Sequence, residues 1–255
     1  MPNEIEPREE PDQQQELQLP LPPLEMGVTC TPQTSECKTL DGTCLEEEMA
    51  VGNTTPGIDL DAIEASGFMP DLVVYQTLAL TTKAESINQF EDYRHAVCGL
   101  VTEVGEIVDG FKRHWFYKKP IEDILKNLKE EIGDVMWSIS LAYYALDEPI
   151  PADIDSEIVE LTAPGLDMIL AKLVRYSSNM FATCFAYPYD SMKSNMDYDL
   201  RQLLTYLAFL ARSYETSLLK EGFNNYMKLK KRYPDGFSSF RALNRNTENE
   251  LSHIH

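Results

Sequence analysis

TEVGEIV (residues 102–108) and EEIGDVM (residues 130–136) are two copies of one pattern, and they decide how the chain folds. Each copy has an acid, a branched aliphatic residue, a glycine, a second acid and another aliphatic residue. Apolar residues continue at helical spacing on both sides of each copy. These stripes are Leu100, Val104, Ile107 and Phe111 in the first segment, and Leu128, Ile132, Val135 and Ile139 in the second. The repeat predicts two amphipathic helices that face each other.

The four acids of the repeat are the candidate metal ligands. Glu103 and Glu106 are three residues apart, as are Glu131 and Asp134, so each pair projects from one side of its helix. Antiparallel packing brings both pairs together. Because unpaired buried charges cost several kcal/mol per ion, we expect a cation among them. Oxygen ligands favour Mg²⁺ or Mn²⁺, and neither segment contains the Glu-x-x-His of di-iron bundles. Acids at this spacing are also common on solvated helix faces, so only the duplication favours a metal site.

Each copy also carries a glycine in the middle of its helix, at Gly105 and Gly133. A glycine inside a helix costs about 1 kcal/mol relative to alanine. Two glycines at matching positions predict that a neighbouring helix or a ligand approaches closely beside the acids. Tight helix packing alone would explain them equally well, and the two interpretations are compatible.

The sequence around the repeat predicts an all-α fold, an antiparallel bundle with a four-helix core plus an inserted helix. The expected helices cover about 70–82, 86–116 with Ser86 as N-cap, Pro120 to about 146, 165–187, and 196–232 with a weak point at Gly222. Residues 147–164 contain three prolines and are expected to form a loop.

Residues 1–69 are predicted to be a disordered acidic tail, because they are rich in Pro, Glu and Gln and lack periodicity. They hold 15 acidic residues against only Arg8 and Lys38. The folded domain is expected over 70–246, with an insertion at about 147–195, followed by a short tail at 247–255. Most of the negative charge therefore belongs to the first tail rather than to the domain.

Composition limits the function. A net charge of −20 disfavours nucleic acid and anionic membranes as partners. With no long apolar run and an acidic start, the chain is expected to be soluble and cytoplasmic. Five cysteines without a Cys-x-x-Cys pair are typical of a reducing compartment. Cys30, Cys37 and Cys44 are seven residues apart, but zinc binding is not expected there because no histidine is near.

The duplicated acids resemble the MazG-like members of the all-α nucleoside triphosphate pyrophosphatases. The resemblance covers roughly 85–245 and rests on GLVTEVGE (99–106), FKRH (111–114), LKEEIGDVMW (128–137) and NYMKLKKRYPDGFS (225–238). It is interrupted by the segment from about 147 to 195. Because that segment adds a helix before the closing one, it leaves the shape of the pocket, and hence the substrate, open.

The resemblance implies Mg²⁺-dependent hydrolysis of a (deoxy)nucleoside triphosphate to a nucleoside monophosphate and pyrophosphate. It implies that Glu103, Glu106, Glu131 and Asp134 bind the metal. Our own hypothesis is that one acid, Glu106 or else Glu103, accepts the proton of the attacking water. The phosphate-binding positions that match the family are Lys112, Asn225, Lys228 and Arg232. Family members usually form dimers or tetramers, so a homo-oligomer is expected.

Several alternatives stay open at this point. Lys112 and Arg232 are also explained as solvated cations near helix ends. His95, Trp115 and Trp137 are candidates for stacking on a base, but aromatic residues at helical spacing are more often core. The chain is alternatively a non-catalytic interaction module with an acidic tail, or an enzyme of the same fold acting on dUTP or phosphoribosyl-ATP.

Overall fold

Every regular element in the described part of the chain is a helix. A computed structural model describes residues 62–63, 66, 71–86, 88–154, 158, 162–234 and 236–243. The chain divides into two units, Met1–Gly52 and Asn53–His255, and all described residues belong to the second. Their helices are α2 (Leu72–Leu80), α3 (Gln89–Tyr117), α4 (Ile121–Ala145), α6 (Leu166–Ala186), α7 (Tyr189–Ser213), α8 (Leu218–Arg232) and α9 (Ser239–Leu243). The all-α prediction is confirmed.

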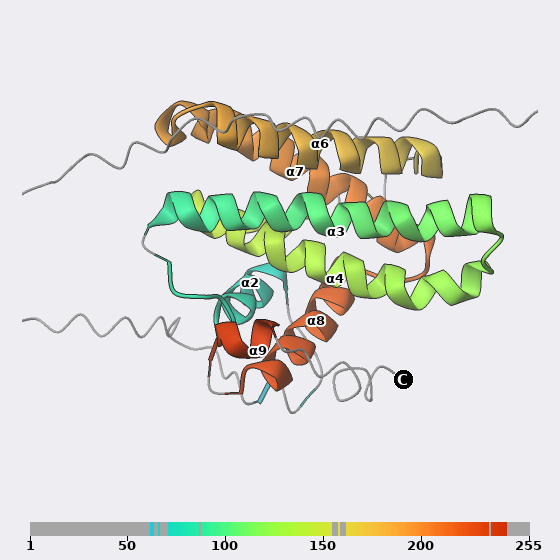
Figure 1. Cartoon of the computed structure of the whole chain (residues 1–255), viewed down its shortest axis with the longest axis horizontal. Coiled ribbons are helices and arrows are strands. Elements are labelled where there is room, and N and C mark those ends of the chain that lie inside the picture. The colour runs from blue at the N-terminus through green and yellow to red at the C-terminus, as the bar shows by residue number, and fades with distance from the viewer. Residues whose placement is uncertain are drawn as a thin grey trace, which may run out of the picture. The chain divides into compact units, whose positions relative to one another are not determined.

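Helices α3 and α4 form the long antiparallel hairpin at the centre of the bundle (Figure 1). The α3 helix ends at Lys118, whose left-handed backbone (φ 60°) turns the chain, and Pro120 occupies the N-cap of α4. The eight apolar residues expected to form the two facing stripes are all at most 3% exposed. The prediction that these stripes pair is therefore confirmed.

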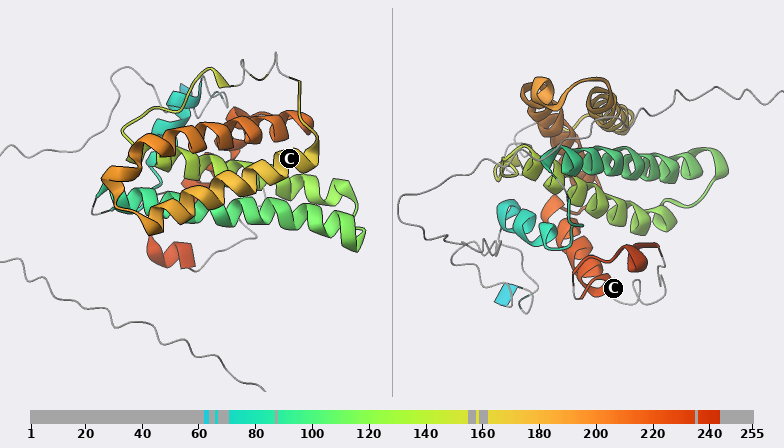
Figure 2. Two further views of the ribbon diagram at one scale, coloured as in Figure 1. Left: turned by 90° about the horizontal axis from the view of Figure 1, so that it is seen from above. Right: turned by 60° about the vertical axis from the view of Figure 1, so that its left-hand side comes forward.

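The remaining helices cover the hairpin from two sides (Figures 1 and 2). On one side α6 and α7 pair with each other, and they pack mainly against α3 and α4, respectively. On the other side α8 and α2 pack against α4 and against each other. Two consequences matter for the site: α8 contacts α4, whereas the described helices leave the face of α3 on that side open.

The start of α3 and the segment before α6 differ from the sequence prediction. The N-cap of α3 is Asn88, whose side chain accepts a hydrogen bond from the Glu91 amide at 3.0 Å. The predicted cap, Ser86, instead accepts one from Lys83 at 3.1 Å. The helix expected from 165 to 187 closely matches α6, and the proline-rich segment before it contains helical backbone at Ile154 and Ile158.

The expected helix over 196–232 is two helices, and it starts earlier. The α7 helix begins directly after Pro188 and ends at Ser213, and α8 begins at Leu218. Glu215 has a left-handed backbone there, and the Ser217 side chain caps α8. Gly222 is not the weak point, because it lies within α8 against the ring of Tyr75.

Some predictions lie outside the described residues. These are the acidic tail before residue 62, the C-terminal tail at 247–255 and the spacing of Cys30, Cys37 and Cys44. Cys98 and Cys184, which are described, are free thiols. Among the described helices, none combines the length and the apolar character needed to cross a membrane.

Candidate metal centre

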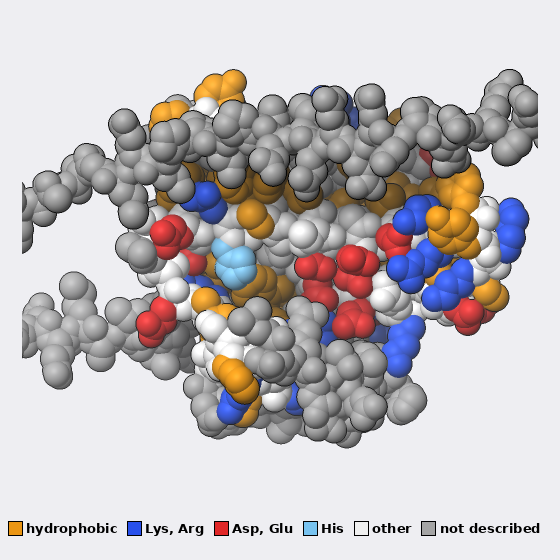
Figure 3. All heavy atoms as spheres, viewed as in Figure 1, with side chains coloured by type: hydrophobic (Ala, Val, Ile, Leu, Met, Phe, Trp, Pro, Cys, Tyr) orange, Lys and Arg blue, Asp and Glu red, His pale blue; other side chains and the backbone are white. Residues whose placement is uncertain are grey.

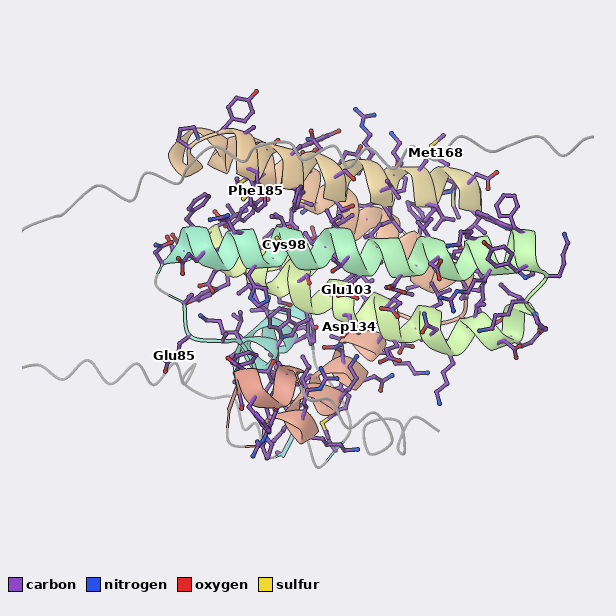
Figure 4. All side chains as sticks on the ribbon, viewed as in Figure 1. Glu85, Cys98, Glu103, Asp134, Met168 and Phe185 are labelled. Atoms are coloured by element: carbon purple, nitrogen blue, oxygen red, sulfur yellow. The ribbon has the colours of Figure 1, made fainter. Side chains whose placement is uncertain are left out.

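Three of the four predicted ligands converge between α3 and α4. Glu103, Glu131 and Asp134 each offer a carboxylate oxygen, and these oxygens lie within 4.8 Å of one another. Figure 4 shows Glu103 on α3 and Asp134 on α4 on the same side of the hairpin, and Figure 3 shows acidic side chains gathered there. Antiparallel packing of α3 and α4 thus brings carboxylates from both helices into one cluster.

The electrostatics of the cluster favour a cation. Burial raises the pKa of Glu131 to about 8, with further contributions from the charges of Asp134 and Glu103. Burial and the charge of Asp134 also raise the pKa of Glu103, although hydrogen bonds with Thr102 and Glu131 oppose this. Burial raises the pKa of a carboxyl group because it disfavours the charged form, and a divalent cation bound among these groups would favour the charged form again. Ligands that offer only oxygen fit a hard divalent ion.

Helix α8 supplies a single ammonium group to this acidic face. Lys228 is 8% exposed, and its Nζ donates hydrogen bonds to both oxygens of Asp134, at 2.9 and 2.8 Å, and to Glu130 at 3.1 Å. Burial lowers the pKa of Lys228, but the charges and hydrogen bonds of Asp134 and Glu130 outweigh it, so the net shift is upward. Lys228 is therefore charged and holds Asp134 in place.

Asn225 lies one turn before Lys228 on the same face of α8. Its amide nitrogen donates a hydrogen bond to Asp134, whereas its buried Oδ1 has no hydrogen-bond partner among the described residues. An unsatisfied buried acceptor costs roughly 1–3 kcal/mol. A ligand or water that donates to this oxygen would recover part of that cost.

The close approach of α8 depends on Gly133. A Cβ atom at this position would lie 2.6 Å from the backbone oxygen of Glu221 and 2.8 Å from Cβ of Asn225. The prediction that a neighbouring helix packs closely on this glycine is confirmed. Gly105 behaves differently, because nothing among the described residues lies within 4 Å of a Cβ built there.

The cluster opens into a cavity of about 610 Å³. Its charged lining comprises the carboxylates of Glu103, Glu106, Glu130, Glu131 and Asp134 and the cations of Lys228 and Arg232. Five carboxyl groups against two cations disfavour an anionic ligand, unless a divalent cation accompanies it. The cavity is large enough for a ligand of several hundred Å³.

Aromatic side chains line another part of the same cavity. Trp137 is held by hydrogen bonds from Nε1 to the oxygens of Ala79, at 3.2 Å, and Thr82, at 2.9 Å. His95 lies edge-on to it, with 5.5 Å between ring centroids. Burial lowers the pKa of His95 and Lys83 lowers it further, against the opposing charge of Asp92, so this ring is neutral near pH 7. Trp115, a candidate in the sequence, is not among the lining residues.

The other sequence candidates are placed unevenly. Glu106 lines the cavity but is exposed and is not part of the three-carboxylate cluster. Arg232 also lines it, through the last turn of α8. Lys112 does not line it, and its ammonium group pairs with Asp109 on the same helix. Glu130, which also lines the cavity, is not among the candidates from the sequence. Its position next to Glu131 is the one sequence feature that could have indicated it.

Comparisons with protein families, curated proteins and solved structures found no relative of this chain. No family model matches the chain, and neither the curated proteins nor the solved structures searched contain a match to it.

Proposed function

We propose that the protein is a Mg²⁺-dependent nucleoside triphosphate pyrophosphohydrolase, which releases a nucleoside monophosphate and pyrophosphate. The observation that supports this proposal is the convergence of Glu103, Glu131 and Asp134 in the wall of a cavity that cations and aromatic rings also line. Mg²⁺, or Mn²⁺ in its place, would be held by these three carboxylates. A triphosphate, a metal and a base each find suitable side chains in this one cavity.

When bound, the divalent ion supplies charge neutralisation for the phosphates and lowers the pKa of the attacking water. The side chains of this chain do the remaining work. Lys228 orients Asp134 and, together with Arg232, stabilises negative charge that develops on phosphoryl oxygens. Glu106 is the proposed proton acceptor, because it faces the cavity without being part of the ligand cluster.

Trp137 and His95 are proposed to contact the base. The two hydrogen bonds of Trp137 fix its indole ring, so little side-chain entropy is lost when a planar group packs on it. Neutral His95 can either donate or accept a hydrogen bond at the edge of the base. These contacts favour a nucleotide over a simple polyphosphate.

The experiment is a panel of nucleotides with Mg²⁺, including the eight common nucleoside triphosphates, dUTP, phosphoribosyl-ATP and inorganic tripolyphosphate, with product identification by anion-exchange chromatography. We expect a nucleoside monophosphate and pyrophosphate from at least one nucleotide and no turnover of tripolyphosphate. Release of orthophosphate in place of pyrophosphate would exclude this reaction. The panel also separates the dUTP and phosphoribosyl-ATP alternatives.

One observation favours a second candidate, a non-catalytic helical interaction module. Lys228 already neutralises Asp134 through two hydrogen bonds, so part of the cluster is satisfied without a metal. In that case the acids are structural. A chain that binds no divalent cation and turns over no nucleotide in the panel would support this second function.

A further inference from the structure

The outward flank of α6 carries a mostly apolar stripe that the described helices leave uncovered. We define the α6 stripe as Asp167, Ala171, Val174, Ser178, Phe181 and Phe185, which follow one another at three- and four-residue spacing and are all exposed. Val174, Phe181 and Phe185 are 42%, 37% and 49% exposed. Helix α6 is at the outside of the bundle, where α3 and α7 are its main packing partners (Figures 1 and 2).

The stripe is asymmetric in size along the helix. Its large residues, Phe181 and Phe185, lie in the second half of α6, and their rings are 4.6 Å apart. The first half carries Ala171 and Val174. In Figure 4 Phe185 and Met168 mark the opposite ends of this helix. A stripe that is bulky at one end and small at the other is complementary to itself when one copy is reversed.

An antiparallel pair of α6 helices matches every position of the stripe. When Ala171 of one copy lies opposite Phe181 of the other, Val174 lies opposite Ser178, and Asp167 lies opposite Phe185. Each pair joins a larger side chain to a smaller one. Because a two-fold interface is isologous, all three pairs occur twice. The contact spans residues 167–185, about 27 Å of helix at 1.5 Å per residue.

Charge complementarity points to the same partner. The guanidinium of Arg94, on α3, lies over the ring of Phe185 at 4.8 Å, and Arg94 is exposed. Asp167 is exposed at the opposite end of the stripe. Neither has an ion-pair partner among the described residues. The reversed alignment that places Asp167 opposite Phe185 also places it beside Arg94 of the other copy, so both charges find a partner twice.

From the matched sizes and charges we propose that a second copy of this chain docks on the α6 stripe. The two α6 helices run antiparallel, and Asp167 of each copy pairs with Arg94 of the other. This surface is built from residues apart from the carboxylate cluster, so the proposal does not depend on the proposed reaction.

The test uses the full-length protein and analytical ultracentrifugation over a range of concentrations. The wild type is expected at twice the chain mass of 29.1 kDa. Phe181→Glu should yield monomer, because it buries a charge in the interface. Phe116→Glu is the matched control: Phe116 is 73% exposed near the end of α3, outside the stripe, and its replacement should leave the dimer intact. Circular dichroism checks that each variant is folded.

Charge reversal then tests the register. Asp167→Arg and Arg94→Asp should each raise the dimer dissociation constant at least tenfold, because each places like charges together twice. Mixing the two variants should restore the dimer, since the mixed pair has both opposite-charge contacts. A monomeric wild type would overturn the proposal and assign the stripe to another occupant. A dimer unaffected by Phe181→Glu, or a mixture that stays monomeric, would overturn it as well.

Discussion

The two copies of the acid-glycine-acid pattern have nearly the same sequence but different surroundings. The copy on α4 is covered by α8: Glu131 is 9% exposed, Gly133 touches the α8 backbone, and Asp134 is bound by Asn225 and Lys228. The copy on α3 is open: apart from the backbone of its own helix, no described atom lies within 4 Å of a Cβ built at Gly105. One copy is therefore fixed by a third helix, and the other presents its acids to the cavity.

This difference shows that acids at matching positions of a duplicated pattern can have different surroundings and different roles. Hydrogen bonds from Asn225 and Lys228 on α8 hold Asp134, a proposed ligand, in place, whereas Glu106, its counterpart on α3, is exposed and outside the cluster. A preorganised ligand binds a metal without losing side-chain entropy. The covered copy should therefore dominate metal binding and folding, and the open copy should contribute mainly through Glu103.

The largest expected effect is on turnover. Asp134→Asn should reduce kcat/KM by roughly 1,000-fold, because losing a metal ligand removes several kcal/mol of transition-state stabilisation at about 1.4 kcal/mol per tenfold. Glu106→Gln, in the open copy, should reduce kcat more than KM, as expected of a proton acceptor. Steady-state pyrophosphate release measures both. Full activity of Asp134→Asn would remove this residue from the site.

The next effect is on folding and compares the two glycines. Gly133→Ala should lower the free energy of unfolding by about 1–3 kcal/mol, because the new methyl group overlaps the α8 backbone. Gly105→Ala should raise it by about 0.5–1 kcal/mol, because the site is open and alanine is the better helix former. Urea titration gives both values. Equal changes in the two variants would contradict the difference in packing.

The smallest expected effect is on the pH dependence of stability without metal. Burial raises the pKa of Glu131 from its ordinary value of 4.5 to about 8, so the folded state binds this proton more tightly than the unfolded chain. Stability should therefore fall as pH rises from about 4.5 to about 8. In Glu131→Gln much of this decline should be absent, so that its Tm falls by a few degrees less than that of the wild type over this pH range.

Thermal melts from pH 4.5 to 8.5 in the presence of a chelator measure this decline. Glu106→Gln is the control, because its exposed carboxyl group should leave the wild-type profile unchanged. Parallel profiles for wild type and Glu131→Gln would show that burial of Glu131 does not govern the metal-free cluster.

The sequence predicted the features that depend on helical periodicity. Val104 and Ile132 were assigned to facing stripes, and both are buried. The convergence of Glu103 with Asp134 follows from the same spacing once the helices are antiparallel. Residues three apart differ by about 60° around a helix, so one member of a pair faces the neighbour more directly than the other. Periodicity alone could not show that Glu106 would be the one left outside.

Other features depended on tertiary contacts. The α7–α8 break at residues 214–217 lacks proline and glycine, so no local signal marked it, although Ser217 is a typical N-cap. Gly222 suggested a break but packs against Tyr75. By contrast, the ion pair of Lys112 with Asp109 is local and follows from their three-residue spacing. The contact of Lys228 with Glu130 required the position of α8, which the sequence did not specify.

The most direct test of the proposed metal centre is a titration of the metal-free protein with Mg²⁺ and Mn²⁺, followed by thermal melts and calorimetry. We predict that the Tm of the wild type and of Glu106→Gln rises with metal concentration, because the ion binds only the folded state, and that Asp134→Asn does not respond. A wild-type Tm and heat signal that stay unchanged up to millimolar metal would contradict the claim that Glu103, Glu131 and Asp134 hold a divalent cation.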